Sequence, residues 1–156
     1  MKRTGFTLIE TLVAISLLTV GVTGSFSLMQ KVTSFASISS SQLTASYLAQ
    51  EGIEIIRSIR DTNYLEGEVW DNGIAAVADA RLDYRSSVFP DAVCGNYLQH
   101  NGTYYICSTD SGSKFQRQIS IVKPLPDKMV VSVTVSWSER GISHQVLAQT
   151  ELRDWR

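Results

Sequence analysis

The sequence predicts an α+β protein in which one long helix precedes an antiparallel sheet. Two observations carry this prediction. An apolar segment near the amino terminus is followed by a stretch without any charge from Val32 to Gln50, whereas the second half of the chain consists of short runs that alternate apolar and polar residues. The alternation is clearest from Met129 to Trp137, as in a strand with one buried face. A helix before such a run of strands is expected to cover one face of their sheet.

The chain begins with a short basic leader, residues 1–5, and continues directly into an apolar segment, residues 6–29. A secretory signal has a shorter apolar stretch followed by a small-residue cleavage site, so this segment is expected to remain in the mature protein. As a helix it spans about 36 Å, enough to cross the ~30 Å hydrocarbon layer of a membrane. Lys2 and Arg3 favour an amino terminus inside the cell, with the bulk of the chain outside.

Glu10 is the one acidic residue of this apolar segment. A carboxylate in hydrocarbon costs on the order of 2–4 kcal/mol and is kept where a partner or a function compensates for it. If the chain is cut after Gly5, the new amino group of Phe6 lies one helical turn from Glu10. The same amine on a neighbouring subunit can pair with this carboxylate.

The segment from Gly5 to Glu10, with the sequence GFTLIE, resembles the class III signal of type IV pilins and of the pseudopilins of type II secretion systems. The resemblance implies that a prepilin peptidase cuts after Gly5 and that Phe6 becomes an N-methylated terminus. It also implies that Glu10 guides subunit assembly and that the fold is pilin-like. It covers about the first thirty residues closely, and the rest only as a pattern of a long helix followed by strands.

Further segments carry a looser resemblance to the pilus-modification (V-type) minor pilins and the I-type pseudopilins. They are Ala49 to Glu54, Val131 to Trp137 and Glu151 to Trp155. Together the resemblances imply a structural, minor subunit of a type IV pilus-like fibre, with a pseudopilin of a type II secretion system as the alternative. The rival from another class is a membrane-tethered binding or enzymatic domain that never polymerises. Glu10 discriminates between these classes, because a simple tether gains nothing from it.

The partners that the resemblance implies are other pilin or pseudopilin subunits, the prepilin peptidase and methyltransferase, and an inner-membrane assembly platform. The lipid bilayer is the expected surrounding of the apolar helix. The protein is expected as a single-pass inner-membrane protein with its amino terminus inside, and then in an extracellular or periplasmic fibre. A formal net charge of −1 at pH 7 predicts no basic surface for nucleic acid.

The helix is expected to continue outside the membrane over residues 30–62 and to end near residues 61–63, where three poor helix formers come together. Residues 32–50 hold no charge. This predicts a helix packed on several sides, partly by its own domain and partly by neighbours. Gly21 and Gly24 allow either the close approach of a neighbouring helix or local unwinding.

Residues 63–156 are expected to form a loop region and an antiparallel sheet domain. Asn101-Gly102 is a strong hairpin signal between two of its strands. The predicted strands are residues 79–89, 97–100, 103–107, 114–122, 129–137 and 143–152.

Cys94 and Cys107 lie around the predicted hairpin, in the part of the chain expected outside the membrane. If the cell is Gram-negative, this compartment is oxidising, so a disulfide is expected. A ring of this size stabilises a fold by roughly 3 kcal/mol. The alternative is a pair of half-buried free thiols.

Catalysis, a metal site and a cofactor are not expected. His100 and His144, the two histidines, have no metal-ligand spacing, and no nucleophile elbow or phosphate-binding loop occurs. Asn101-Gly102-Thr103 matches the glycosylation triplet, but its place in the predicted turn accounts for it. Four aspartates of the middle region lack the spacing of a calcium loop: Asp71, Asp79, Asp83 and Asp91.

Overall fold

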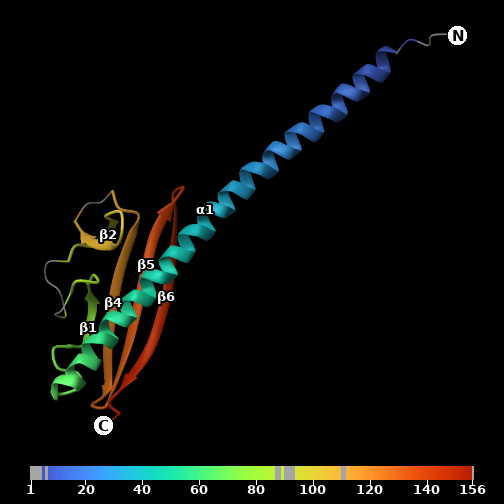
Figure 1. Ribbon diagram of the computed structural model, residues 1–156. Helices are drawn as coiled ribbons and strands as arrows, with labels where there is room; N and C mark the ends of the chain where they lie inside the picture. The colour runs from blue at the N-terminus through green and yellow to red at the C-terminus, as the bar shows by residue number, and fades with distance from the viewer. Residues whose placement is uncertain (1–4, 6, 87–88, 90–93, 110–111, 156) are drawn as a thin grey trace. The chain divides into compact units, whose positions relative to one another are not determined.

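The computed structural model describes residues 5, 7–86, 89, 94–109 and 112–155. Within them the chain forms one helix and a six-stranded antiparallel sheet, which confirms the α+β prediction (Figure 1). Contacts group residues 1–40 and residues 41–156 into two compact units. The elements are α1 (Leu8–Glu66), β1 (Val77–Ala80), β2 (Tyr97–His100), β3 (Tyr105–Ser108), β4 (Phe115–Leu125), β5 (Lys128–Glu139) and β6 (Ile142–Arg153).

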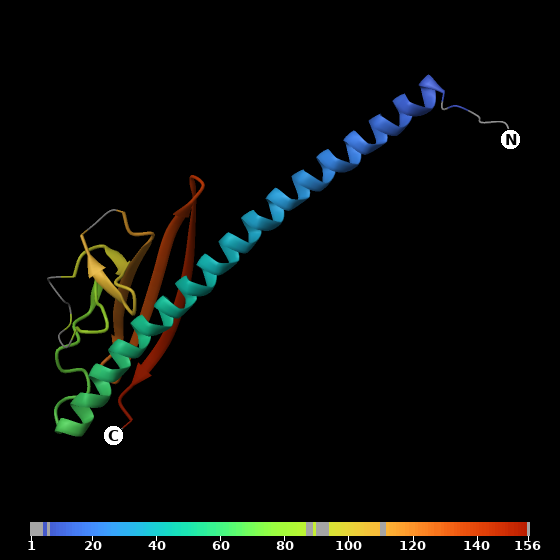
Figure 2. The same ribbon diagram turned by 45° about the horizontal axis from the view of Figure 1, so that its top comes forward.

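The sheet has the strand order β3-β2-β4-β5-β6, and β1 pairs with β4 beside β2. The three carboxy-terminal strands form long hairpins, with Val131 of β5 opposite both Ile121 of β4 and Thr150 of β6. In both ribbon views the second half of α1 lies across one face of this sheet (Figure 2). Within residues 41–156, the core therefore lies between this part of α1 and the inner sheet face.

The second half of α1 packs on the sheet through one seam of small and aliphatic residues. Gly52 lies in this seam, and a Cβ atom there would be 2.9 Å from Cγ1 of Val133, so the missing side chain lets the helix approach β5 closely. The alternation predicted for β5 is confirmed, because every second side chain from Met129 to Trp137 is buried. The buried seam of the helix is Ala45, Leu48, Ala49, Gly52, Ile53 and Ile56.

The predicted end of the helix at residues 61–63 is wrong, because α1 continues to Glu66. Asn63 explains the difference. Its buried side-chain amide donates hydrogen bonds to the backbone carbonyls of Trp70 (3.2 Å) and Asn72 (2.9 Å) in the following loop. A residue that disfavours helices in isolation is held in the helix here by a tertiary contact.

The helix then stops at Gly67, which has a φ of 77°. The Gly67 N–H donates to the carbonyl of Tyr64, and the Glu68 N–H donates to the carbonyl of Asn63. This pair of bonds is the Schellman motif, which satisfies carbonyls left free at a helix end. A glycine at this position takes the left-handed conformation without a Cβ penalty.

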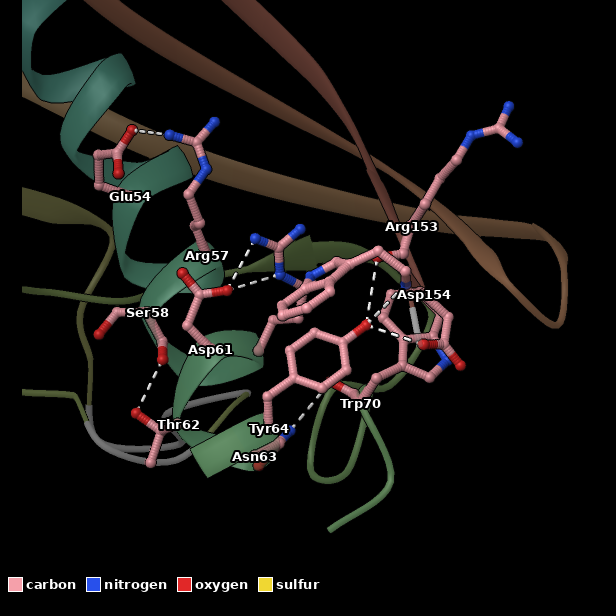
Figure 3. Close-up of polar contacts among 12 residues, drawn as sticks. Glu54, Arg57, Ser58, Asp61, Thr62, Asn63, Tyr64, Trp70, Arg153 and Asp154 are labelled. Carbon is pink, nitrogen blue, oxygen red and sulfur yellow. Dashed lines mark hydrogen bonds and ion pairs between the residues drawn. The ribbon is translucent and has the colours of Figure 1, made fainter. Parts of the chain in front are cut away.

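The last turn of α1 also contacts the carboxy-terminal tail through the side chain of Tyr64 (Figure 3). The Tyr64 hydroxyl donates to Oδ1 of Asp154 (2.9 Å) and accepts from the Trp155 N–H (3.1 Å). The rings of Tyr64 and Trp155 also lie 4.6 Å apart. Burial raises the pKa of Tyr64, and the neighbouring Asp154 carboxylate adds to this effect.

The prediction of one strand over residues 79–89 is wrong. The strand β1 ends at Ala80, and the chain turns at Asp83. Asp83 Oδ1 accepts the Arg85 N–H (2.8 Å), and its carbonyl accepts the Ser86 N–H (3.0 Å). Side-chain bonds of this kind compete with strand pairing. The remaining predicted residues 87–88 lie outside the described part.

The hairpin of β2 and β3 is confirmed, with a longer loop than predicted. His100 pairs with Tyr105, so Thr103 belongs to the loop and not to the strand. The Asn101 side chain shapes this loop by accepting the N–H groups of Thr103 (3.0 Å) and Tyr104 (2.9 Å).

The strand β4 continues to Leu125, beyond its predicted end at Val122. The segment between these residues contains Pro124, which lacks an N–H for the ladder. The pairing with β5 is irregular there and resumes with Leu125 opposite Lys128. The strand therefore continues past Pro124 through a local shift in register, although a proline at this position favours the end of a strand.

Candidate assembly site in the amino-terminal helix

The first turn of α1 is closed by a reciprocal pair of bonds between Thr7 and Glu10. The Glu10 N–H donates to the Thr7 hydroxyl (3.3 Å), and the Thr7 N–H donates to Oε2 of Glu10 (3.5 Å). This is a capping box, which satisfies two amides left free at a helix start. A carboxylate in the first turn also interacts favourably with the helix dipole. The sequence pattern Thr-x-x-Glu is a sufficient signal for this contact, but the sequence prediction did not include it.

Gly5 and Glu10, two of the predicted processing and assembly residues, are exposed. Phe6 and the leader cations Lys2 and Arg3 lie outside the described residues. The bond that Glu10 makes to Thr7 is at the upper limit of hydrogen-bond length and uses one carboxylate oxygen. The carboxylate thus has a local role in the helix and remains accessible to a further cation.

The helix that follows exposes its large apolar side chains on all sides. Among those from Leu8 to Met29, the exposed fraction runs from 48% at Val13 to 83% at Leu8. A window of this helix has a mean hydropathy of 1.9 and none of its residues is buried, so the helix is long and apolar enough to cross a membrane. An apolar surface of this extent marks contact with lipid or with other proteins.

Five hydroxyl groups of this apolar segment donate hydrogen bonds to carbonyls of the preceding turn of the helix. Thr19 donates to the carbonyl of Ile15 (2.8 Å), and Ser25 donates to the carbonyl of Gly21 (2.9 Å). Such bonds to the preceding turn remove the cost of an unpaired hydroxyl in hydrocarbon. Further hydroxyls with this arrangement belong to Thr11, Ser16, Thr23 and Thr33.

Gly21 opens a shallow groove on the helix surface, with a volume of about 240 Å³ between Val22, Ser25, Phe26 and Met29. The helix is continuous through Gly21 and through the second glycine of the segment, so the alternative of local unwinding does not apply to this structure. Small residues four positions apart, here Gly21 and Ser25, allow the backbones of two membrane helices to approach closely.

Residues 1–26 match the family model described as the prokaryotic N-terminal methylation motif. The chain carries the class III prepilin signal of type IV pilins and pseudopilins. The motif implies processing by a prepilin peptidase and assembly with other pilin subunits, and it is typical of structural proteins rather than of enzymes. The apolar helix fits the membrane anchor of such a protein. Comparisons with curated proteins and with solved structures gave no match.

In the sheet-containing unit, a buried cation fixes α1 to the sheet. The Arg117 side chain is 1% exposed and lies 3.5 Å from the Glu51 carboxylate. Its guanidinium donates to the backbone carbonyls of Leu48 (3.0 Å) and Leu82 (2.5 Å). Burial raises the pKa of Glu51, and the charge of Arg117 opposes this rise. The sequence signal for this buried charge is an arginine at an inward position of an alternating strand, and the sequence prediction did not use it.

Cys94 and Cys107 form a disulfide, as predicted, with their Cα atoms 5.0 Å apart. The Cys107 N–H donates to Oδ2 of Asp83 (3.1 Å). Burial of Asp83 opposes its ionisation, but hydrogen bonds from Arg85 and Cys107 outweigh this effect and lower the pKa of Asp83. The disulfide and the turn at Asp83 therefore support each other.

The candidate residues for other chemistry have structural contacts. His100 accepts the Gly102 N–H through Nδ1 (3.2 Å), and His144 stacks on Trp137 with ring centroids 5.3 Å apart. Within the described ranges, no three His, Cys, Asp or Glu residues are grouped so as to hold a metal ion. Asp71 pairs with Lys123, Asp79 with Arg81 and Asp83 with Arg85, whereas Asp91 lies outside these ranges.

One cluster brings a serine hydroxyl to a lysine. Ser41 accepts a bond from the Lys114 ammonium (2.6 Å), which also lies 3.1 Å from the Glu139 carboxylate. The Ser41 hydroxyl in turn donates to the Glu139 carboxylate (3.1 Å), so the lysine is a donor to the serine oxygen and the serine proton points to the carboxylate. The cluster fastens α1 to β5 and to the residue before β4, and it does not form a nucleophile with its base.

Proposed function

We propose that the protein is a structural, minor subunit of a type IV pilus-like fibre. The observation that carries this proposal is a methylation motif followed directly by a continuous helix with exposed apolar side chains on every side. In the membrane, lipid covers this surface. In the fibre, the corresponding helices of neighbouring subunits cover it, and the sheet domain lies at the fibre surface.

In this proposal the chain is anchored in the inner membrane with its amino terminus inside, and cleavage after Gly5 produces a mature terminus at Phe6 that is then methylated. The new amine is a cation, and an equivalent amine of the adjacent subunit pairs with Glu10. The exposure of Glu10 and its single long contact to Thr7 support this role, because an accessible carboxylate gains more from a cation than from an amide.

The groove at Gly21 supports the packing of helices within the fibre. A neighbouring apolar helix that enters it meets Val22, Phe26 and Met29 and no unpaired hydroxyl, because Ser25 is bonded to its own backbone. The exposed Phe35 and Tyr47 extend this apolar surface beyond the membrane segment. The charge-free stretch from residue 32 to residue 50 is thus covered partly by its own domain and, in the proposal, partly by neighbours.

A pseudopilin of a type II secretion system carries the same signal. The two candidate functions therefore differ in the assembly that the subunit enters, a pilus or a secretion system, and not in the chemistry of the subunit. The experiment uses the native host. Surface fibres are sheared and analysed for the chain by mass spectrometry, in cells with and without the prepilin peptidase. Its presence in sheared fibres only when the peptidase is active supports the pilus proposal.

Two other outcomes contradict the pilus proposal. If the chain stays in the cell envelope and its deletion abolishes protein secretion but not fibres, the pseudopilin function is correct. If the chain is processed normally but is found in neither fibre nor secretion machinery, it is a membrane-tethered domain.

A further inference from the structure

A polar hollow of about 420 Å³ lies on the sheet where β4 begins and the antiparallel strand β5 ends. Phe115 and Trp137 are buried in the core, so their chain neighbours Gln116 and Ser136 point to the opposite sheet face. The uncharged polar side chains that line the hollow are Tyr97, Ser113, Gln116, Ser136, Ser138 and Ser143.

The strand register brings these residues together from four strands. Tyr97 of β2 is opposite Gln116 of β4, and Gln116 is opposite Ser136 of β5. In the next row on the same face, Ser138 of β5 is opposite Ser143 of β6. Residues opposite each other in an antiparallel pair have Cβ atoms about 5 Å apart, so these polar groups form one continuous surface.

None of these six side chains makes a hydrogen bond to another group in the described part of the chain. The same sheet face shows the contrasting case farther along β5, where Ser132 accepts a bond from Gln149 (3.1 Å). The hollow therefore gathers free donors and acceptors, because each hydroxyl offers both functions and the Gln116 amide offers two donors and an acceptor.

Among the described residues that line it, the hollow offers no free charge to a ligand. Lys114 contributes to its wall, but the ammonium is bonded to the Glu139 carboxylate and to the Ser41 hydroxyl. A phosphate or carboxylate ligand would need a free cation, and an apolar peptide would need an apolar lining. The lining supplies hydroxyls, an amide, the edge of the buried Trp137 and the half-buried ring of Tyr97, which has one apolar face and a polar tip.

We propose that this hollow binds a neutral saccharide. Sugar hydroxyls pair with the hydroxyls of Ser136, Ser138 and Ser143 and with the amide of Gln116. The C–H face of the sugar ring packs on Tyr97. This inference concerns a separate site on the sheet domain and is independent of the fibre proposal.

The test uses the full-length chain in a detergent without a sugar headgroup, applied to an array of neutral and acidic oligosaccharides. The strongest neutral ligand is then titrated by calorimetry against the wild type, Gln116→Ala, Ser138→Ala and Tyr97→Ala. Each lost hydrogen bond or ring contact is expected to weaken the affinity about fivefold or more. Ser132→Ala and Gln149→Ala, on the same face outside the hollow, are the matched controls and are expected to bind as the wild type does.

Unchanged thermal unfolding of each variant establishes that the sheet is intact. The proposal is overturned if no neutral saccharide is retained, or if acidic oligosaccharides alone bind. It is also overturned if Ser132→Ala weakens binding as much as Gln116→Ala does, because the binding surface then lies elsewhere on the sheet.

Discussion

Arg117 of β4 donates a hydrogen bond to the backbone carbonyl of Leu48 over 3.0 Å and so joins the sheet to the middle of α1. The same guanidinium reaches the carbonyl of Leu82 in the segment after β1. One buried cation therefore connects helix, strand and loop. The anchored part of α1 begins at Ser41 in the same unit, so this contact determines how the second half of the helix is presented by the domain.

Arg117→Ala is expected to lower the free energy of unfolding by about 3–5 kcal/mol, because it leaves Glu51 and two backbone carbonyls without their buried partner. Denaturant unfolding followed by tryptophan fluorescence measures the change. Gln118→Ala, at the adjacent exposed position, is the control and is expected to change the free energy by no more than about 0.5 kcal/mol. Equal stability of the two variants would contradict the role assigned to Arg117.

Asp83→Asn is expected to lower stability by about 1.5–3 kcal/mol at neutral pH, because charged hydrogen bonds to Arg85 and Cys107 are weakened. The pKa of Asp83 lies below its ordinary value of 3.8 in the folded state. Its contribution is therefore present above pH 3.8 and disappears as the pH falls through the lower folded pKa. Melting curves from neutral to acidic pH test this. If the difference in stability between wild type and variant persists at the lowest pH, the ionised Asp83 carboxylate is not its source.

Reduction of the bond between Cys94 and Cys107 is expected to lower the stability of the sheet domain by about 3 kcal/mol, with no effect on membrane insertion. The bond and the apolar helix belong to different units of the chain. Alkylation before and after reduction, followed by mass spectrometry, tests the pairing. Thiols that react in the untreated exported protein would refute it, and a Cys94→Ser/Cys107→Ser variant controls for effects of the reductant.

The mature chain is expected to begin at Phe6, because Gly5 has no side chain to obstruct a peptidase and the basic leader is expected to stay inside the cell. Mass spectrometry of the amino terminus from native cells decides this, and it also detects a methyl group on Phe6. Gly5→Leu is expected to remain unprocessed in the membrane. An intact Met1 in assembled fibres, or cleavage beyond Met29, is incompatible with this prediction.

Most of the fold could be predicted from local patterns. The apolar segment and the period-two alternation of residues 129–137 are properties of adjacent residues, and the structure preserves both. The errors depend on contacts between distant residues. Asn63 continues the helix because its amide reaches Trp70 and Asn72, which no local propensity encodes.

The candidate site shows the same division. The processing and assembly residues were assigned from a contiguous motif, whereas the role of Arg117 depends on Leu48 and Leu82, far away in the sequence. The capping box of Thr7 and Glu10 is an exception, because it is local and was still missed. The capping box matters for the functional proposal, because it gives Glu10 a structural role within its own helix that does not depend on assembly into a fibre.

Three variants separate the capping role of Glu10 from its proposed role in assembly. Glu10→Gln removes the charge but keeps an oxygen that accepts the Thr7 N–H, as a capping box allows. Thr7→Ala removes the cap but keeps the charge. Glu10→Ala removes both and is expected to insert into the membrane more easily, because a hydrocarbon cost of about 2–4 kcal/mol is relieved.

The most direct measurement is the abundance of each variant in sheared fibres relative to its abundance in membranes, with the wild type expressed in the same cells. If Glu10 pairs with the Phe6 amine of the adjacent subunit, Glu10→Gln is incorporated as poorly as Glu10→Ala, and Thr7→Ala is incorporated like the wild type. If Glu10→Gln instead enters fibres like the wild type while Thr7→Ala does not, the carboxylate only caps the helix, and the assembly role is contradicted.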